Sequence, residues 1–373
     1  MYEPINNYPH EQLTPEILES LAMIYKMRVN PIRATVRGMY DLQFERIKLG
    51  QRIMAQKKVQ LGGEPGKKEE DTIIEDEDQE VLDVMRTEYR KMMDGVKNVR
   101  LSNFKAGASP LISTLAEFCM MQTYMLLEAD ELHCKKQLDQ VLRDFPIYTE
   151  YLSKITGIGV SMAGVIISEI NIVKAPYVSS LWKYAGLSVE KDNRGTSRRK
   201  EHQTVHKYIN REGEEKERLG VEHNTFLKSK LTFVMSGCLI KAKNPRYRAI
   251  YDNYKTRMEN HAVHGVQNDG QKVQLHDRDG NLCVYQDPGE EVKKHYMKQD
   301  LDRIGQPLMI FVSKGHRHRM AIRYMVKMFL QDLYPVWRRL ENLPVALPYA
   351  EAKLGRPPHR GGEPPVLAAE GKA

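Results

Sequence analysis

Residues 147–170 read IYTEYLSKITGIGVSMAGVIISEI, and this stretch decides the fold that the sequence predicts. Helical patterns over 148–155 and 161–170 flank the segment Ile155-Thr156-Gly157-Ile158-Gly159. Two glycines around one aliphatic residue allow a tight turn that side chains would block. Small residues in the second helix would let the two helices approach closely, and Ile158 would fill the apolar space between them. The stretch therefore predicts a helix–hairpin–helix.

The predicted turn suits a phosphate group. It exposes successive backbone N–H groups just before a helix N-terminus, where the helix dipole is positive. In this respect it resembles the helix–hairpin–helix motif of DNA repair and recombination proteins, whose Gly-hydrophobic-Gly turn binds the DNA backbone without reading sequence. The resemblance implies that Gly157, Ile158, Gly159 and Ser161 bind DNA. The alternative is a tight turn between two helices of an ordinary helical core.

The charge of the chain is unevenly divided. Residues 1–150 carry 20 basic and 25 acidic side chains, whereas residues 151–373 carry 37 basic and 24 acidic ones. A basic half joined to an acidic half is expected where one part meets a polyanion and the other part assembles. Solvated surface charge is the alternative.

The remaining composition indicates a reducing compartment. The four cysteines are scattered without a CxxC pair, which favours free thiols and argues against a cysteine-based zinc site. The N-terminus lacks a signal-peptide pattern, and no run approaches the roughly 18 apolar residues that a membrane span needs. We expect a soluble, cytoplasmic protein with no membrane partner, no metal site and no cofactor of its own.

The pattern along the chain predicts a mainly α fold with small β-hairpin insertions. We expect a helical, coiled-coil-like region over 1–145 with an acidic linker at about 62–80, a helix–hairpin–helix domain over 146–354 and a disordered tail over 355–373. A helix should begin at Thr14-Pro15-Glu16 and break or kink at Pro31. A long helix over 111–145 should either dimerise, which makes a homo-oligomer, or pack within its own chain.

Two short hairpins and a last helical region complete the prediction. The first hairpin should turn at Asn210-Arg211-Glu212-Gly213, and the second at Asp279-Gly280. Helical pattern over 307–343 should be interrupted by Gly315 and Pro335. Within that region Arg319, Arg323 and Lys327 recur every four residues, so they share one helix face and could clamp a phosphate backbone. An ordinary solvated face is the alternative.

These motifs together resemble the C-terminal domain of insertion-sequence one-ten family transposases. The resemblance rests on ITGIG at 155–159, SEI at 168–170 and LWKYAGL at 181–187. It continues through NTFLK at 224–228, YRAIYD at 247–252 and HRHRMA at 316–321, so it covers about residues 147–354. It implies a function in DNA transposition and recombination, with DNA as partner.

The chain also departs from that family. The family's transposases begin with a RuvC-like domain that carries four acidic metal ligands, and residues 1–145 show no such strand-rich framework. Magnesium would therefore enter only if a partner supplied an acidic site. The resemblance allows a partner protein or a guide RNA to supply what the missing domain does.

The resemblance also implies a serine nucleophile, which the family carries in a Ser-Gly pair soon after "AGL". The nearest match is Ser197, although Arg198 follows it instead of glycine. Arg198, Arg199 and Lys200 could neutralise the charge of an attacked phosphate, and His202 or His206 could take the serine proton. The alternative is a basic loop that only contacts phosphate.

Two functions follow from the sequence. The first is a transposase-like DNA-binding protein that acts in transposition or recombination, with catalysis left open. The second is a non-catalytic, structure-selective DNA-binding or accessory protein that dimerises through its N-terminal helices.

Overall fold

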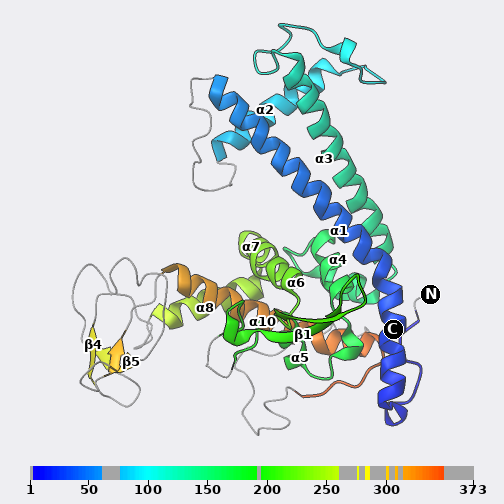
Figure 1. Ribbon diagram of the computed structural model, residues 1–373, viewed down its shortest axis with the longest axis vertical. Coiled ribbons are helices and arrows are strands. Elements are labelled where there is room, and N and C mark those ends of the chain that lie inside the picture. Colours follow the sequence, from blue (N-terminus) through cyan, green and yellow to red (C-terminus); the bar gives the residue numbers. More distant parts are fainter. Residues whose placement is uncertain are drawn as a thin grey trace, which may run out of the picture. The chain divides into compact units, whose positions relative to one another are not determined.

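The computed structural model describes residues 3–60, 76–190, 195–259 and 314–347, together with short strands at 275–276, 282–285, 300–301 and 307–309. The protein is mainly helical, as the sequence predicts (Figure 1). Its chain divides into two compact units. One unit joins Met1–Arg28 to Phe145–Ala373, and the other is Val29–Asp144. Among the described residues, no helix has both the length and the apolar character that crossing a membrane requires.

The unit Val29–Asp144 is built from most of α1 (Pro15–Gln60), with α2 (Asp76–Met92) and α3 (Leu115–Leu142). Arg46 of α1 pairs with Glu131 of α3, and Lys57 pairs with Glu117, so α1 and α3 run antiparallel. The predicted long helix thus packs within its own chain. Apolar side chains from these helices and the segment before α3 form one core: Ile53, Met54, Leu82, Met85, Tyr89, Ile112, Phe118, Met121 and Tyr124.

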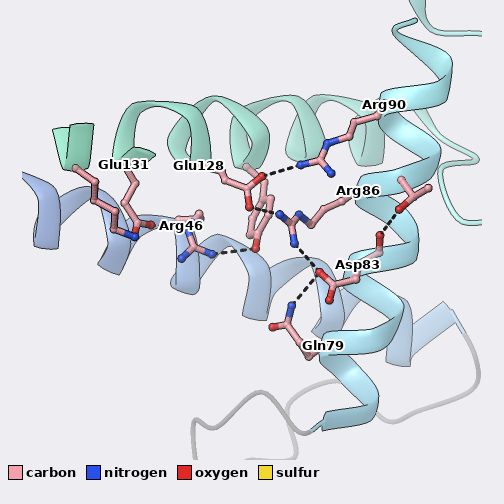
Figure 2. A network of polar contacts seen from close by, with 10 residues as sticks. Arg46, Gln79, Asp83, Arg86, Arg90, Glu128 and Glu131 are labelled. Atoms are coloured by element: carbon pink, nitrogen blue, oxygen red, sulfur yellow. Dashed lines mark hydrogen bonds and ion pairs between the residues drawn. The ribbon is translucent and has the colours of Figure 1, made fainter. Parts of the chain in front are cut away.

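A polar network joins the three helices beside this core (Figure 2). The Arg86 guanidinium of α2 bonds Asp83 at 2.6 Å and also bonds Glu128 of α3. Arg46 donates from Nε to Glu131 at 2.8 Å and from Nη1 to the Tyr124 hydroxyl at 3.1 Å. Because each carboxylate has a cationic donor, the charges between the helices are compensated.

Helix α1 begins where the sequence predicts and continues past the predicted break. The Leu18 N–H donates to the Thr14 carbonyl at 3.0 Å, and Pro15 is the first residue of the helix. Pro31 lies inside α1, so the predicted break is wrong. Proline removes one backbone hydrogen bond, but Val29, Ile32 and Val36 are buried around it. Their packing holds the helix together against that loss.

Two further helix bounds differ from the prediction. Residues 76–80 of the predicted acidic linker belong to α2, and the rest of the linker, 62–75, lies outside the described residues. Helix α3 begins at Leu115 rather than 111, because Thr114 and Glu117 form a capping box there.

The other unit is built around α10 (Lys314–Leu340), which packs closely on α8 (Pro245–Glu259) and touches α5 (Val178–Tyr184). The side chains of Met325, Phe329, Leu333 and Trp337 on α10 are buried. Around them lie two irregular helical segments, Ile147–Tyr151 and Leu152–Lys154, then α4 (Val160–Glu169), α6 (Thr225–Ser229), the π-helical segment Lys230–Met235 and α7 (Ser236–Lys241). Single 3₁₀ turns of this unit occur at His10–Gln12, Ile172–Lys174 and Lys200–His202, and one at Leu101–Asn103 belongs to the unit Val29–Asp144.

The first residues of the chain belong to this unit and not to the helical region predicted over 1–145. The Ile5 N–H donates to Glu341 Oε2 at 3.0 Å, and the Asn6 side-chain amide donates to the Asn342 carbonyl at 2.7 Å. Tyr25 donates from its hydroxyl to the Ile167 carbonyl at 3.2 Å. These contacts span long stretches of sequence, which is why periodicity alone did not reveal them.

The strands include both predicted hairpins. β1 (Thr204–Ile209) and β2 (Glu215–Gly220) pair antiparallel from Thr204↔Gly220 to Ile209↔Glu215. Their turn is closed by Asn210, with Gly213 at φ +83°. A second sheet has the order β3 (Leu275–His276), β4 (Leu282–Tyr285), β6 (Pro307–Met309) and β5 (Asp300–Leu301), and β3 pairs antiparallel with β4. The predicted turn at Asp279-Gly280 and the tail 355–373 lie outside the described residues.

The last helix also differs from its prediction. Residues 307–309 form strand β6, and the helix begins at Lys314. Gly315 and Pro335 both lie inside α10 without interrupting it, so that part of the prediction is wrong. Leu333 and Trp337 are buried on either side of Pro335, and their packing compensates for the missing backbone donor.

Candidate functional site

The tight turn predicted at residues 155–159 forms, but the helix predicted before it over 148–155 is replaced by the two irregular segments Ile147–Tyr151 and Leu152–Lys154. The Ile158 N–H donates to the Ile155 carbonyl at 2.9 Å, and α4 begins at Val160 with Gly159 as its N-cap. Ile158 is buried, as expected for a residue that fills the space beneath the turn. Gly159 is exposed, while Ser161 is partly buried in the first turn of α4.

Gly157 has a packing reason for being glycine. Its φ is +99°, and a Cβ there would lie 3.1 Å from the Cys238 carbonyl oxygen and 3.1 Å from Leu239 Cα. The Asn244 side-chain amide donates to the neighbouring Thr156 carbonyl at 2.9 Å. The turn is therefore pressed against the end of α7, so packing alone accounts for Gly157. Gly159 has no atom within 4 Å of its Cβ position, so packing does not require a glycine there.

A second glycine turn, at the end of α5, organises a basic loop. Gly186, at φ +65°, ends the helix, and the Leu187 N–H donates back to the Trp182 carbonyl at 2.8 Å. Beyond this turn, Val189 pairs with Gly195 in an isolated antiparallel β-bridge. This places residues 195–200 beside the start of α6.

Thr196 is a buried residue of this loop and holds it by hydrogen bonds. Its hydroxyl donates to Glu190 Oε1 at 2.6 Å, and its carbonyl accepts from Lys228 Nζ at 2.7 Å. Lys228 belongs to α6, whose N-cap Asn224 donates to Glu169 of α4 at 2.6 Å. The loop, α6 and the end of α4 are thus bonded into one frame.

Five cations meet around this frame, and we call them the basic cluster: Arg198, Lys228, Arg319, Arg323 and Lys327. The Arg323 guanidinium lies against Gly195, where a Cβ would collide with it. Lys327 lies over the Trp182 ring at 5.2 Å. In the part of the chain that the structure describes, none of the five forms an ion pair with a carboxylate.

Three residues of the basic cluster have pKa values that are lowered by burial and by their charged neighbours. Burial and then the charges of Arg323 and Arg198 lower the pKa of Lys228 to about 8. Burial and a like-charged neighbour also lower the pKa of Arg323 and that of Lys327. Because desolvation and repulsion both disfavour the cations, an anion placed among them would relieve both.

Ser197 and His202 are adjacent in the same loop. Ser197 Oγ lies 2.9 Å from His202 Nδ1, and the Ser197 backbone N–H donates to the same nitrogen at 3.1 Å. Since a backbone N–H can only donate, Nδ1 accepts in this geometry, and the serine hydroxyl can donate to the same nitrogen. The other histidine considered, His206, instead contacts the Thr204 hydroxyl at 3.3 Å.

The structure brings together some of the predicted site residues and not others. Arg198 and the α10 residues Arg319, Arg323 and Lys327 join one cluster. Arg199 and Lys200 are exposed, and Arg199 donates its backbone N–H to Ser197 Oγ at 3.3 Å. The ITGIG turn instead lies against the end of α7 and is bonded to Asn244, so it meets a different part of this unit.

Sequence reasoning missed three residues of this site: Glu190, His223 and Lys228. Lys228 stands in the stretch that carries the family resemblance, but its spacing from Ser197 indicates no shared role. His223 and Lys228 meet the loop because both lie against Gly186, where a Cβ would fall 2.5 Å from the histidine ring and 2.9 Å from the lysine stem. Only the fold creates that proximity.

The comparisons with known proteins do not add to this geometry. No protein-family model matches the chain, and neither a curated protein nor a solved structure matches it. Within the residues that the structure describes, no three His, Cys, Asp or Glu side chains gather so as to hold a metal ion.

Proposed function

We propose that this protein binds the phosphate backbone of DNA as a transposase-like DNA-binding protein that acts in recombination. The basic cluster is the observation that carries the proposal. Neighbouring cations without carboxylate partners among the described residues favour a polyanion, and burial together with like-charge repulsion lowers the pKa of Lys228, Arg323 and Lys327. The family resemblance of residues 147–354 and the exposed α4 N-terminus at Gly159 support the same partner.

A specific observation supports the catalytic form of this function. Ser197 Oγ and His202 Nδ1 are within hydrogen-bond distance. In the proposed step, Oγ bonds to a DNA phosphorus and a phosphorus–oxygen bond of the strand breaks. The serine proton passes to Nδ1 and is then available to the departing DNA oxygen, while the basic cluster neutralises the charge that develops on the phosphate.

DNA binding is tested by fluorescence anisotropy with duplex, single-stranded and four-way-junction DNA over a salt series. We expect steeply salt-dependent binding. The plot of log K against log salt has a negative slope. An Arg319→Ala/Arg323→Ala variant should reduce the magnitude of that slope by about 0.9 for each duplex phosphate that it no longer neutralises. Arg339→Ala is the matched control, because this exposed arginine lies on the same helix away from the cluster. Equal binding by both variants would refute the proposal.

The same samples separate the catalytic from the non-catalytic form. A covalent protein–DNA adduct on denaturing gels that Ser197→Ala abolishes, while DNA affinity is kept, supports the serine step. Binding to a preferred DNA structure without any adduct favours the non-catalytic accessory protein. Partner proteins, a guide RNA and assembly through the N-terminal helices stay predictions of the sequence.

A further inference from the structure

His223 is a buried histidine at the inner edge of the basic cluster. The residue is 7% exposed, and Nδ1 has no hydrogen-bond partner among the residues that the structure describes. Buried polar atoms are nearly always hydrogen-bonded, so an unbonded ring nitrogen at a cationic site indicates a missing partner. The ring is held in place by its contact with the backbone at Gly186.

The charged groups that face this ring come from two directions. Lys228 approaches from α6, while Arg198 and Glu190 approach from the loop after α5. Arg323 of α10 acts on Lys228 in turn. Burial and then the charges of Lys228 and Arg198 lower the pKa of His223, against an opposite effect from Glu190. The ring is therefore neutral at neutral pH in the free protein.

We propose that Arg198, His223, Lys228 and Arg323 form a binding site for a single phosphate group, and that His223 takes up a proton when the phosphate binds. This inference rests on the proposed function for the source of the phosphate, which is DNA. The cations would neutralise the phosphate, and the protonated ring would donate to a phosphate oxygen. The orphaned Nδ1 then gains its partner.

The proton comes from solvent, and linkage gives the direction of the pH effect. An anion in the cluster cancels the repulsion from Lys228 and Arg198, so the pKa of His223 is higher in the complex than in the free protein. Affinity for the anion is then greatest below the free-state pKa and falls as pH rises toward the pKa of the complex. Lys228, with a pKa of about 8, weakens binding further at higher pH in the same direction.

Sulfate is the probe for this site, because it is a tetrahedral dianion whose own charge does not change between pH 5 and 8. Calorimetric titration of the full chain, at pH 6.5 in two buffers with different heats of ionisation, counts the protons taken up. We expect sulfate binding with an uptake of up to one proton. In His223→Gln that uptake should disappear, because glutamine keeps a donor but cannot titrate. His206→Gln is the matched control and should leave the uptake unchanged.

Lys228→Arg provides an independent measurement if His223→Gln does not fold. Arginine keeps the charge without titrating near neutrality, so proton uptake that persists in this variant excludes Lys228 as its source. Absence of sulfate binding, binding without proton uptake, or an unchanged uptake in His223→Gln would each overturn the inference. Uptake that is lost in Lys228→Arg would overturn it as well.

A competition experiment distinguishes the inference from the proposed function. Sulfate should displace bound DNA more effectively at pH 6 than at pH 8, compared with chloride at equal ionic strength. DNA binding that sulfate does not displace would leave the proposed function standing and would assign the phosphate site to another source. Sulfate binding by a protein that does not bind DNA would refute the proposed function alone.

Discussion

At the scale of single residues, the two glycines of the ITGIG turn have different roles. Gly157 combines a φ of +99° with backbone atoms 3.1 Å from its Cβ position, whereas Gly159 has open space around it and a φ of −93°. We predict that Gly157→Ala lowers the free energy of unfolding by about 1–3 kcal/mol, because the added methyl strains the turn against α7. Urea denaturation followed by tryptophan fluorescence measures this loss.

Gly159→Ser is the control for that prediction. Serine is a favoured N-cap residue and meets no atom at this position, so stability should be unchanged or slightly higher. DNA affinity of the same variant then reports on the exposed α4 N-terminus without a change in the fold. Equal destabilisation by the two substitutions would show that Gly157 is not held by its packing.

Only some residues of the site could be predicted from the sequence. Arg319, Arg323 and Lys327 could be assigned to one face because four-residue spacing is a local property of a helix. His223 could not be assigned, because its role depends on the contact with Gly186, 37 positions earlier in the chain. A site assembled by such contacts leaves no periodic signal in the sequence.

At the scale of elements, an ion pair between the partly exposed Arg246 and the buried Asp332 joins α8 to α10. Arg246 donates from Nε and Nη2 to the Asp332 carboxylate at 2.6 and 2.8 Å, and the Tyr247 hydroxyl donates to the same group at 3.1 Å. The Asp332 side chain is 4% exposed. We predict that Asp332→Asn costs about 3–5 kcal/mol, because it leaves the arginine charge uncompensated between the helices.

Asp252→Asn is the matched control on α8. Asp252 pairs with Arg248 at 2.6 Å, but this i,i+4 pair is exposed, so its loss should cost about 0.5 kcal/mol or less. Thermal unfolding of both variants compares the two costs. A similar small effect for both substitutions would mean that apolar packing, not the ion pair, holds α8 on α10.

Packing between elements explains why the helix breaks predicted at Pro31 and Pro335 do not occur. Pro31 and Pro335 are local signals for a break, and local chemistry is all that a single sequence displays. Both residues lie where neighbouring positions on the same helix are buried, and packing outweighs the lost backbone bond. The hairpin turn at Asn210–Gly213 was predictable because its side-chain and glycine chemistry is complete within the turn itself.

At the scale of the whole molecule, the two units can be followed by different spectroscopic signals. Both tryptophans of the chain, Trp182 and Trp337, belong to the unit that contains Phe145–Ala373. The unit Val29–Asp144 is helical and contains none. Tryptophan fluorescence therefore follows one unit, whereas far-ultraviolet circular dichroism follows both, and transitions that do not coincide would identify independent unfolding.

We expect acid to destabilise the unit Val29–Asp144 more than the other unit. The cause is the carboxyl group of Glu117. Burial alone would raise the pKa of this carboxyl, but hydrogen bonds from Lys57, Gln60 and two backbone amides lower it to about 2. A folded-state pKa below the unfolded value of 4.5 means that the unfolded chain binds the proton more readily. The resulting stabilisation, up to about 3 kcal/mol, is complete above pH 4.5 and is lost as the pH falls toward 2.

We therefore predict that urea midpoints measured by circular dichroism fall between pH 5 and pH 3 more than those measured by fluorescence. Glu117→Gln should destabilise the unit Val29–Asp144 at neutral pH, because Lys57 loses its buried carboxylate, and should flatten that acid dependence. Glu128→Gln removes a less buried carboxylate from the same helix and should keep the acid dependence. An acid dependence that survives in Glu117→Gln would place its source in other carboxylates, and the Lys57–Glu117 pair would then contribute to packing geometry without setting the acid limit of this unit.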